Sequence, residues 1–294
     1  MSHPWQAERL VDAELARALV REQFPSIRAD TVELVSAGWD YTVHRVDEEW
    51  AFRFPRRELV LVPMRLEVAV LPALAPSLPV PVPAAVHLGR PGDRFPWPFY
   101  GARWLAGREA ALAPERDALA GELGRFLRRL HDTNAPELPV DVNGRADMPK
   151  RVPLTRAALA EIDGLWAAPP AVDGLLRDAA RLAPPEHTVV CHGDLHFRQL
   201  LVDGPRLTGV VDWVDVCLSD PGIDLMVVCA FLPPESRPAF FAEYGEASDD
   251  SLLRARVLAL NLSAILARWA HVERNGPVEQ EALASLDRAV ADLV

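Results

Sequence analysis

The side chains with the clearest chemical potential lie in one stretch, VVCHGDLHFRQLLVDGPRLTGVVDWVDV, at residues 189–216. Two carboxylates in it, Asp194 and Asp212, follow short apolar runs. Phosphoryl transfer from a nucleotide needs a carboxylate that accepts the proton of the attacking hydroxyl, and oxygen ligands that hold magnesium on the phosphates. The stretch supplies both kinds of group.

A metal-binding loop is the rival interpretation, because His-x-Asp-x-His at 192–196 offers nitrogen and oxygen ligands that suit zinc or iron. Such a site needs further histidine or carboxylate ligands on a matching scaffold. The other histidines form no recognisable set: they are His3, His44, His87, His131, His187 and His271. Hydrolytic metal chemistry is therefore disfavoured.

Short elements must position the two carboxylates. The apolar, β-branched runs at 188–190, 200–202 and 207–211 predict strands, with the loop HGDLHFRQ after the first of them. Asp203-Gly204-Pro205 predicts a turn between the second and third strands. A hairpin of this kind folds back on the loop, so it can bring Asp194 and Asp212 together.

The first hundred residues predict a β-rich lobe. Apolar spacing at about 8–24 suits a short helix, and residues 31–55 resemble an antiparallel meander of three strands. A helix is expected at 64–74, where the prolines of LPVPVP end it. A further strand pair is expected at 84–87 and 99–105.

The pattern becomes helical after Pro114. One apolar face of a long helix is formed by Leu119, Leu123, Phe126, Leu127 and Leu130. Helical patterns follow at 155–182, where prolines interrupt them, and at 252–269. The fold class is therefore α+β, with a boundary near 103–107.

Composition limits the kinds of partner. The chain has 294 residues, 50% of them hydrophobic, and a formal net charge of -11, which disfavours binding to nucleic acid or an anionic membrane. No apolar run approaches the roughly 18 residues that span a bilayer, and the N-terminal stretch lacks the apolar core of a signal peptide. We expect a cytoplasmic protein. Three cysteines without paired spacing predict no disulfide framework.

Lys150 is the only lysine in the chain, and arginine takes the place of lysine everywhere else. Any mechanism that needs a lysine elsewhere in the chain is thereby excluded.

The stretch HGDLHFRQLLVDGPRLTGVVDW resembles the HGDxxxxN motif followed by (I/V)DW of the aminoglycoside phosphotransferase family, whose fold is similar to that of protein kinases. The matches run in order from about Leu34 to Val228. The others are Asp40 in SAGWDYTV, WAFRFPRR, Glu67 in RLEVAVLPAL, LPVPVP, RWLAG, LGRFLRRLH and DPGIDL.

This resemblance implies a two-lobed, protein-kinase-like fold with a small antiparallel-sheet N-terminal lobe and a larger, mainly helical C-terminal lobe. Residues 1–103 would bind the nucleotide, and residues 104–294 would hold the catalytic and acceptor-binding groups. The implied activity is transfer of the γ-phosphoryl group of ATP or GTP to a hydroxyl of an antibiotic, with Mg²⁺ as cofactor. A macrolide is the first expected acceptor and an aminoglycoside the second, and the protein is expected to be a monomer.

The resemblance also implies roles in the catalytic stretch. Asp194 would be the catalytic base, His192 would orient its loop through backbone contacts, and Asp212 would bind magnesium. Gln199 stands where the family's second metal ligand, usually Asn, is found. His196 would only pack the loop, and Asp220 and Asp224 in DPGIDL would support the catalytic core by capping and hydrogen bonding.

In the N-terminal lobe, Arg53 stands where kinases usually have a phosphate-anchoring lysine. A guanidinium can bind phosphates bidentately, and macrolide phosphotransferases have a similar WVLRIPRR stretch. Glu67 would pair with Arg53. The glycine-poor turn SAGWDYTVH would cover phosphates through backbone amides or the hydroxyls of Ser36 and Thr42, and Trp104 would line the purine pocket.

Two alternatives stay open. Gln199 and Arg53 depart from the commonest kinase pattern, which is compatible with a catalytically silent, nucleotide-binding relative. The second alternative is an acceptor of another class, since family members phosphorylate small metabolites such as choline-like compounds or sugar alcohols. Turnover of ATP or GTP with a hydroxylated acceptor separates an enzyme from a protein that nucleotide only stabilises.

Overall fold

The computed structural model describes residues 7–111, 113, 115–135 and 137–293. It contains two compact units. The N-terminal unit is the chain up to Ser77 together with Pro81–Ala106, and the C-terminal unit is Leu78–Val80 with the chain from Gly107 onward. The assignment of residues 1–103 to nucleotide binding and 104–294 to catalysis stays a prediction.

An antiparallel sheet forms the centre of the N-terminal unit, with strand order β1-β2-β3-β5-β4. Its strands are β1 (Val32–Ala37), β2 (Tyr41–Val46), β3 (Trp50–Pro55), β4 (Ala85–Gly89) and β5 (Phe99–Arg103). Both predicted groups of strands are present. The β-branched and aromatic residues of these runs suit a pleated surface that is covered on both faces.

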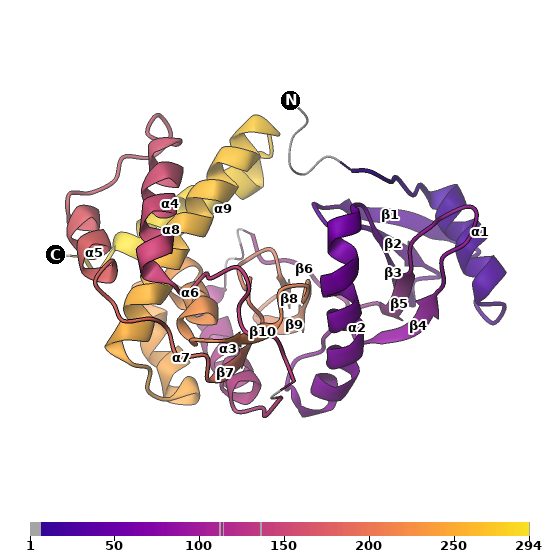
Figure 1. Cartoon of the computed structure of the whole chain (residues 1–294), viewed down its shortest axis with the longest axis horizontal. Helices are drawn as coiled ribbons and strands as arrows, with labels where there is room; N and C mark the ends of the chain where they lie inside the picture. Colours follow the sequence, from indigo (N-terminus) through magenta and orange to yellow (C-terminus); the bar gives the residue numbers. More distant parts are fainter. Residues whose placement is uncertain (1–6, 112, 114, 136, 294) are drawn as a thin grey trace. The chain divides into compact units, whose positions relative to one another are not determined.

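Helices α1 (Ala13–Gln23) and α2 (Leu61–Leu74) lie on opposite sides of this sheet (Figure 1). Successive strand residues point to opposite faces. Phe52 and Phe54 of β3 therefore join the aromatic core beside α1, and Arg53 between them points toward α2. The carboxylate of Asp12 caps α1 by accepting the amide of Leu15 at 2.8 Å.

Helix α2 begins three residues before the predicted start, after a 3-10 turn at Glu58–Val60, and it continues into another at Ala75–Ser77. The resulting helical run, Glu58–Ser77, is long and apolar enough to cross a membrane, which corrects the expectation that no run approaches that length. One such helix is weak evidence of a membrane span. A mostly buried core helix of a soluble protein also passes the same test; in this run 28% is buried, with Met64, Glu67 and Leu71 among the buried residues of α2.

Most of the C-terminal unit is helical. Its helices are α3 (Arg116–His131), α4 (Met148–Ala160), α5 (Ala171–Ala179), α6 (Gly222–Ala230), the 3-10 turn Pro234–Ser236, α7 (Arg237–Tyr244), α8 (Asp249–Val272) and α9 (Gly276–Val290). Helix α8 packs against α4, α6 and α9, and every residue of α6 is buried. The core of this unit therefore lies around α6 and α8.

Two small sheets lie among these helices. One pairs β7 (Val189–Cys191) with β10 (Cys217–Ser219); the other has the order β6-β8-β9, from β6 (Arg108–Glu109), β8 (Leu200–Asp203) and β9 (Arg206–Val210). The β8–β9 hairpin is the predicted one, and its register places Leu200 opposite Val210. The two units together confirm the α+β, kinase-like fold class, although α4 begins seven residues before the predicted 155 and a turn separates it from α5.

Candidate active site

The loop after β7 carries the HGD motif, and Gly193 determines its path. Gly193 has a φ of +90°, in the left-handed region, and a Cβ built on it would lie 2.2 Å from the carbonyl oxygen of Asp215. Both the backbone conformation and the close approach require glycine. The backbone conformation of Gly193 therefore determines the direction of the next residue, Asp194.

His192 fixes this loop from the inside. Its Nε2 lies 3.0 Å from the carbonyl oxygen of Val211, and its Nδ1 accepts the backbone N–H of Asp194 at 3.3 Å. These contacts assign the ring proton to Nε2. Burial lowers the pKa of His192, so the ring is neutral near pH 7. Both ring nitrogens contact backbone groups, which is the arrangement that the predicted orienting role of His192 requires.

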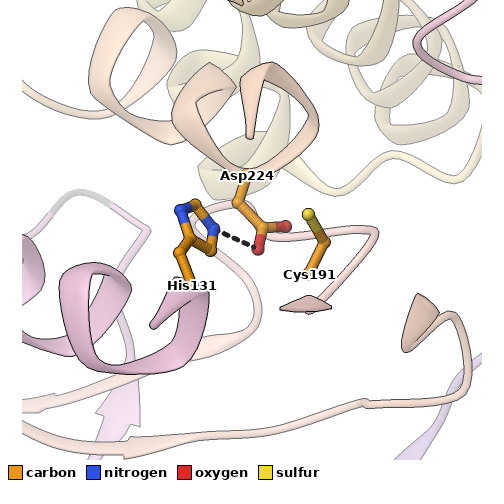
Figure 2. Close-up of side chains that lie close together, drawn as sticks. All are labelled: His131, Cys191 and Asp224. Atoms are coloured by element: carbon orange, nitrogen blue, oxygen red, sulfur yellow. Dashed lines mark hydrogen bonds and ion pairs between the residues drawn. The ribbon is translucent and has the colours of Figure 1, made fainter. Parts of the chain in front are cut away.

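The carboxylate of Asp224 in α6 lies beside His131 and Cys191 (Figure 2), and it holds the backbone of the HGD loop. One carboxylate oxygen accepts the backbone N–H of His192 at 2.8 Å, and the other accepts that of Gly193 at 3.0 Å. His131 contacts Asp224 at 3.2 Å and the hydroxyl of Tyr244 at 2.8 Å. The supporting role expected for the DPGIDL segment is thus visible in the contacts.

His131, Cys191 and Asp224 also have ligand atoms within 4.8 Å of one another, which is a spacing that a metal ion can use. Here the Asp224 oxygens are occupied by backbone amides. Burial, the largest cause, raises the pKa of the Cys191 thiol well above its ordinary value, so the sulfur is protonated. We interpret this group as a buried structural network.

Asp194 is the accessible member of the loop, with 31% of its side chain exposed. Nε2 of His196 lies 3.7 Å from one of its carboxylate oxygens, and Nδ1 of His196 accepts the backbone N–H of Arg198 at 3.3 Å. Burial holds the pKa of His196 well below its ordinary value. The neutral ring thus presents its N–H side to Asp194.

Asp212 lies two residues after the end of β9 and adopts a φ of +68°, which is unusual for a residue with a side chain. Such strain persists where surrounding contacts enforce it, and it is common at functional sites. Nε2 of Gln199 lies 3.4 Å from Oδ2 of Asp212, and the Gln199 carbonyl accepts the backbone N–H of Val211 at 2.9 Å. The hairpin therefore brings Asp212 and Gln199 together, while the predicted approach of Asp194 to Asp212 stays a prediction.

The oxygen atoms of this pair suit a hard cation. Oε1 of Gln199 is buried and has no hydrogen-bond partner among the residues described. A buried orphan acceptor is costly unless something binds it. With the Asp212 carboxylate beside it, the amide oxygen offers the all-oxygen ligation that Mg²⁺ prefers, so the two residues fit a magnesium ion.

In the N-terminal unit, Arg53 and Glu67 form the predicted pair. Their nearest charged atoms are 3.7 Å apart, and both side chains are buried. The hydroxyl of Tyr41 donates to Glu67 at 3.0 Å, and the Arg53 guanidinium lies over the Tyr41 ring, 5.6 Å from its centroid. Burial and then Glu67 raise the pKa of Tyr41, which keeps it protonated as a donor.

The other three predicted nucleotide contacts differ in their placement. Ser36 and Arg53 share a face of the sheet, because each of them pairs with Val43 in the strand register. Thr42 is buried and pairs with Phe54 on the opposite face, a placement that does not support contact with the phosphates that Arg53 would bind. The guanidinium of Arg45 lies 4.8 Å from the ring centroid of Trp104, so one face of that ring is covered.

Comparison with known proteins decides the family. The profile of the phosphotransferase enzyme family matches residues 31–260, most of the chain. The chain belongs to this family. Family membership confirms the expected resemblance and the expected enzyme class, a phosphotransferase that uses an alcohol group as acceptor. No curated protein matches the sequence closely enough to serve as a relative.

Solved structures agree on the fold. The GDP and kanamycin complex of APH(2'')-IIIa superposes with a TM-score of 0.70 at 21% identity, covering 95% of this chain and 99% of that one. Macrolide 2'-phosphotransferase MphH from Brachybacterium faecium gives 0.60 at 22% identity, with 93% and 98% covered. Macrolide 2'-phosphotransferase type I gives 0.61 at 18% identity, with 95% and 98% covered. At these identities the likeness shows the fold.

Sequence reasoning did not single out some side-chain contacts that the structure shows within each unit. Arg57 pairs with Asp40 in the turn between β1 and β2, and Arg56 donates to the carbonyl of Gly38 there. Arg145, from the loop after α3, forms an ion pair with Asp215 at 2.8 Å. The available signal for that loop was Asp-x-Asn-Gly at 141–144, which is typical of a turn.

Proposed function

We propose that this phosphotransferase transfers the γ-phosphoryl group of ATP or GTP to a hydroxyl of an antibiotic, with macrolides as the first acceptor class and aminoglycosides as the second. The observation that carries the proposal is the combination of a partly exposed Asp194, on a loop held by His192 and Asp224, with the amide of Gln199 beside the carboxylate of Asp212. These are the parts that phosphoryl transfer requires.

In the proposed transfer of the γ-phosphoryl group, each of these residues has one role. The acceptor hydroxyl oxygen forms a bond to the γ-phosphorus, the bond from that phosphorus to the bridging oxygen breaks, and the nucleoside diphosphate leaves. Asp194 accepts the hydroxyl proton, while neutral His192 keeps the loop in place. Asp212 and Gln199 would hold Mg²⁺, which supplies charge neutralisation on the phosphates when bound.

Arg53 would anchor the nucleotide phosphates, with Glu67 holding its guanidinium. Ser36 lies on the same sheet face and supports this assignment, while Thr42 and Trp104 stay sequence predictions. Either purine nucleotide is a candidate donor. Among the proteins of similar fold, APH(2'')-IIIa was solved with GDP and APH(2'')-Ib with ADP.

The macrolide preference is supported by the stretch around Arg53, WAFRFPRR, which is similar to the WVLRIPRR type of stretch in macrolide phosphotransferases. We further propose a cytoplasmic monomer that binds neither nucleic acid nor membranes, in keeping with its net charge of -11.

Two observations favour a second candidate, a nucleotide-binding relative without activity: Gln199 replaces the usual Asn, and Arg53 replaces the usual lysine. A kinase of a small hydroxylated metabolite is a third candidate, because the same groups serve any acceptor hydroxyl.

A mass-spectrometric assay separates these candidates. Purified protein is incubated with Mg²⁺ and either ATP or GTP, and with separate pools of macrolides, aminoglycosides, and simple amino and sugar alcohols. A phosphorylated macrolide is the expected product. Product only from the small alcohols would indicate the metabolite kinase, and nucleotide-dependent stabilisation without any product would indicate the silent relative.

A further inference from the structure

The loop between α3 and α4 is fastened to the strand that leads out of the active site. The backbone N–H of Leu218 in β10 donates to the carbonyl of Pro139 at 2.8 Å, and the N–H of Asp141 donates to the carbonyl of Leu218 at 3.0 Å. Strand β10 pairs in turn with β7, with Cys217 opposite Cys191. Because β7 leads directly into the HGD loop, residues 139–145 are joined to that loop through one shared sheet.

The side chain of Arg145 connects this loop to Asp215, which follows β9. Its guanidinium lies 2.8 Å from Oδ1 of Asp215 and 3.7 Å from Oδ1 of Asp141. Asn143 donates to the same Asp215 oxygen at 3.2 Å. The exposed fractions of the side chains are 18% for Arg145, 25% for Asp215 and 1% for Asp141, so these pairs are much less solvated than ordinary surface ion pairs.

Asp215 transmits the position of Arg145 to the catalytic loop. Its backbone carbonyl is the group that approaches Gly193 so closely that no Cβ fits there. Gly193 is the residue directly before Asp194. A shift of the Asp215 backbone therefore changes the space that the catalytic loop occupies.

The charges around Arg145 also favour its interaction with these carboxylates. Burial lowers the pKa of Arg145, but the carboxylates of Asp215, Asp194 and Asp141 together raise it above its ordinary value. The guanidinium thus stays charged at every physiological pH, and it lies within electrostatic range of Asp194.

We propose that Arg145 is a positioning residue for the transfer reaction: by bridging Asp141 and Asp215 it holds the backbone at Gly193 and keeps Asp194 in place. The proposal rests on the proposed function only in naming Asp194 as the base. The mechanical claim, that Arg145 restrains the HGD loop, is independent of any acceptor.

Hydrogen exchange followed by mass spectrometry tests the mechanical claim on the full-length protein without substrates. In Arg145→Ala, the backbone amides of residues 192–194 are expected to exchange at least about tenfold faster than in the wild type. Arg156→Ala is the matched control, because Arg156 forms an exposed ion pair with Asp173. Equal exchange of this peptide in Arg145→Ala and wild type would overturn the proposal.

Turnover provides the second readout. The kcat of Arg145→Ala should fall about tenfold or more, the KM for nucleotide should stay within twofold, and Arg145→Lys should recover part of the loss. A normal kcat in Arg145→Ala with an active wild type would overturn the positioning role. If the wild type phosphorylates no acceptor, the proposed function fails, and the exchange experiment still decides whether Arg145 restrains the loop.

Discussion

Gln199 is the residue at which this chain departs most clearly from the usual pattern of its family. The longer side chain still reaches Asp212, and its Oε1 is left buried without a hydrogen-bond partner among the described residues. A buried acceptor of this kind is costly by itself, so a ligand for it is physically reasonable. The departure from Asn therefore still leaves an amide beside Asp212, the proposed magnesium ligand.

Magnesium dependence tests this interpretation. In Gln199→Ala, the Mg²⁺ concentration for half-maximal turnover should rise about tenfold or more, because one oxygen ligand is lost. Gln199→Asn should keep most of the wild-type dependence. Gln280→Ala, an exposed substitution on α9, is the control. An unchanged Mg²⁺ titration in Gln199→Ala would assign this amide a purely structural role.

His44 gives a pH dependence that belongs to the folded N-terminal unit. Its ring is fully buried and contacts the carbonyl of Val11 at 2.9 Å. Burial, the largest influence, lowers its pKa, although the Val11 carbonyl and Asp12 act in the opposite direction. The unfolded chain therefore binds the proton first, and His44 makes the free energy of unfolding decrease as pH falls below about 6.5.

Urea unfolding at pH 5.5 and 7.5 measures this contribution. The wild type should lose more stability on acidification than His44→Gln, by at most about 1.4 kcal/mol per pH unit for one proton. His187→Gln, at an exposed position, should behave like the wild type. A His44→Gln variant with the same pH dependence as the wild type would contradict the assignment.

At the scale of elements, the turn at Gly193 determines where β7 delivers the catalytic loop. Gly193→Ala should lower the melting temperature and reduce kcat more than tenfold, because a Cβ strains the left-handed backbone by about 1–3 kcal/mol and also meets the Asp215 carbonyl. Gly174→Ala, in helix α5 with open space around it, should instead stabilise the protein by roughly 0.5–1 kcal/mol.

Thermal unfolding and steady-state kinetics of the two glycine variants provide the comparison. If Gly193→Ala matched the wild type in both measurements, the close approach at Asp215 would have no functional consequence.

Elements with a clear period were predictable from the sequence. The strands β1 to β3, helix α3 and the β8–β9 hairpin all follow alternation or helical spacing. Helix α6 was missed because it is short and buried on every side, so it shows no amphipathic pattern. Strand β10 was missed because three residues carry too little pattern.

Side-chain direction was the harder part of the site to predict. Thr42 lies in the expected strand, but its side chain points to the face of the sheet opposite Arg53. A shift of the strand register by one residue would place it on the other face. Arg145 depends on a loop that is fastened to β10 by backbone hydrogen bonds, which no residue type encodes.

At the scale of the whole molecule, nucleotide binding should appear as stabilisation of the folded state. A nucleotide present at about 100 times its Kd adds roughly 2.7 kcal/mol to the free energy of unfolding. Mg²⁺ with ATP or GTP should therefore raise the melting temperature of the wild type by several degrees.

Arg53→Ala should abolish most of this nucleotide-dependent shift, because the proposed phosphate anchor is lost. Its own stability should also fall, since Glu67 is left buried without its cation. Each variant is compared with and without nucleotide, so that this loss cancels. Arg65→Ala, at an exposed position on α2, should keep the full shift; a full shift in Arg53→Ala would assign phosphate binding elsewhere.

The central claim is that Asp194 is the base of a phosphoryl transfer to an acceptor hydroxyl, and the rate of product formation by Asp194→Asn measures it most directly. With Mg²⁺, nucleotide and the accepted antibiotic, the variant should be slower than the wild type by about a hundredfold to ten-thousandfold. Its nucleotide-dependent rise in melting temperature should be unchanged, which shows that the fold and the donor site are intact. A variant that forms phosphorylated product at the wild-type rate would contradict the claim.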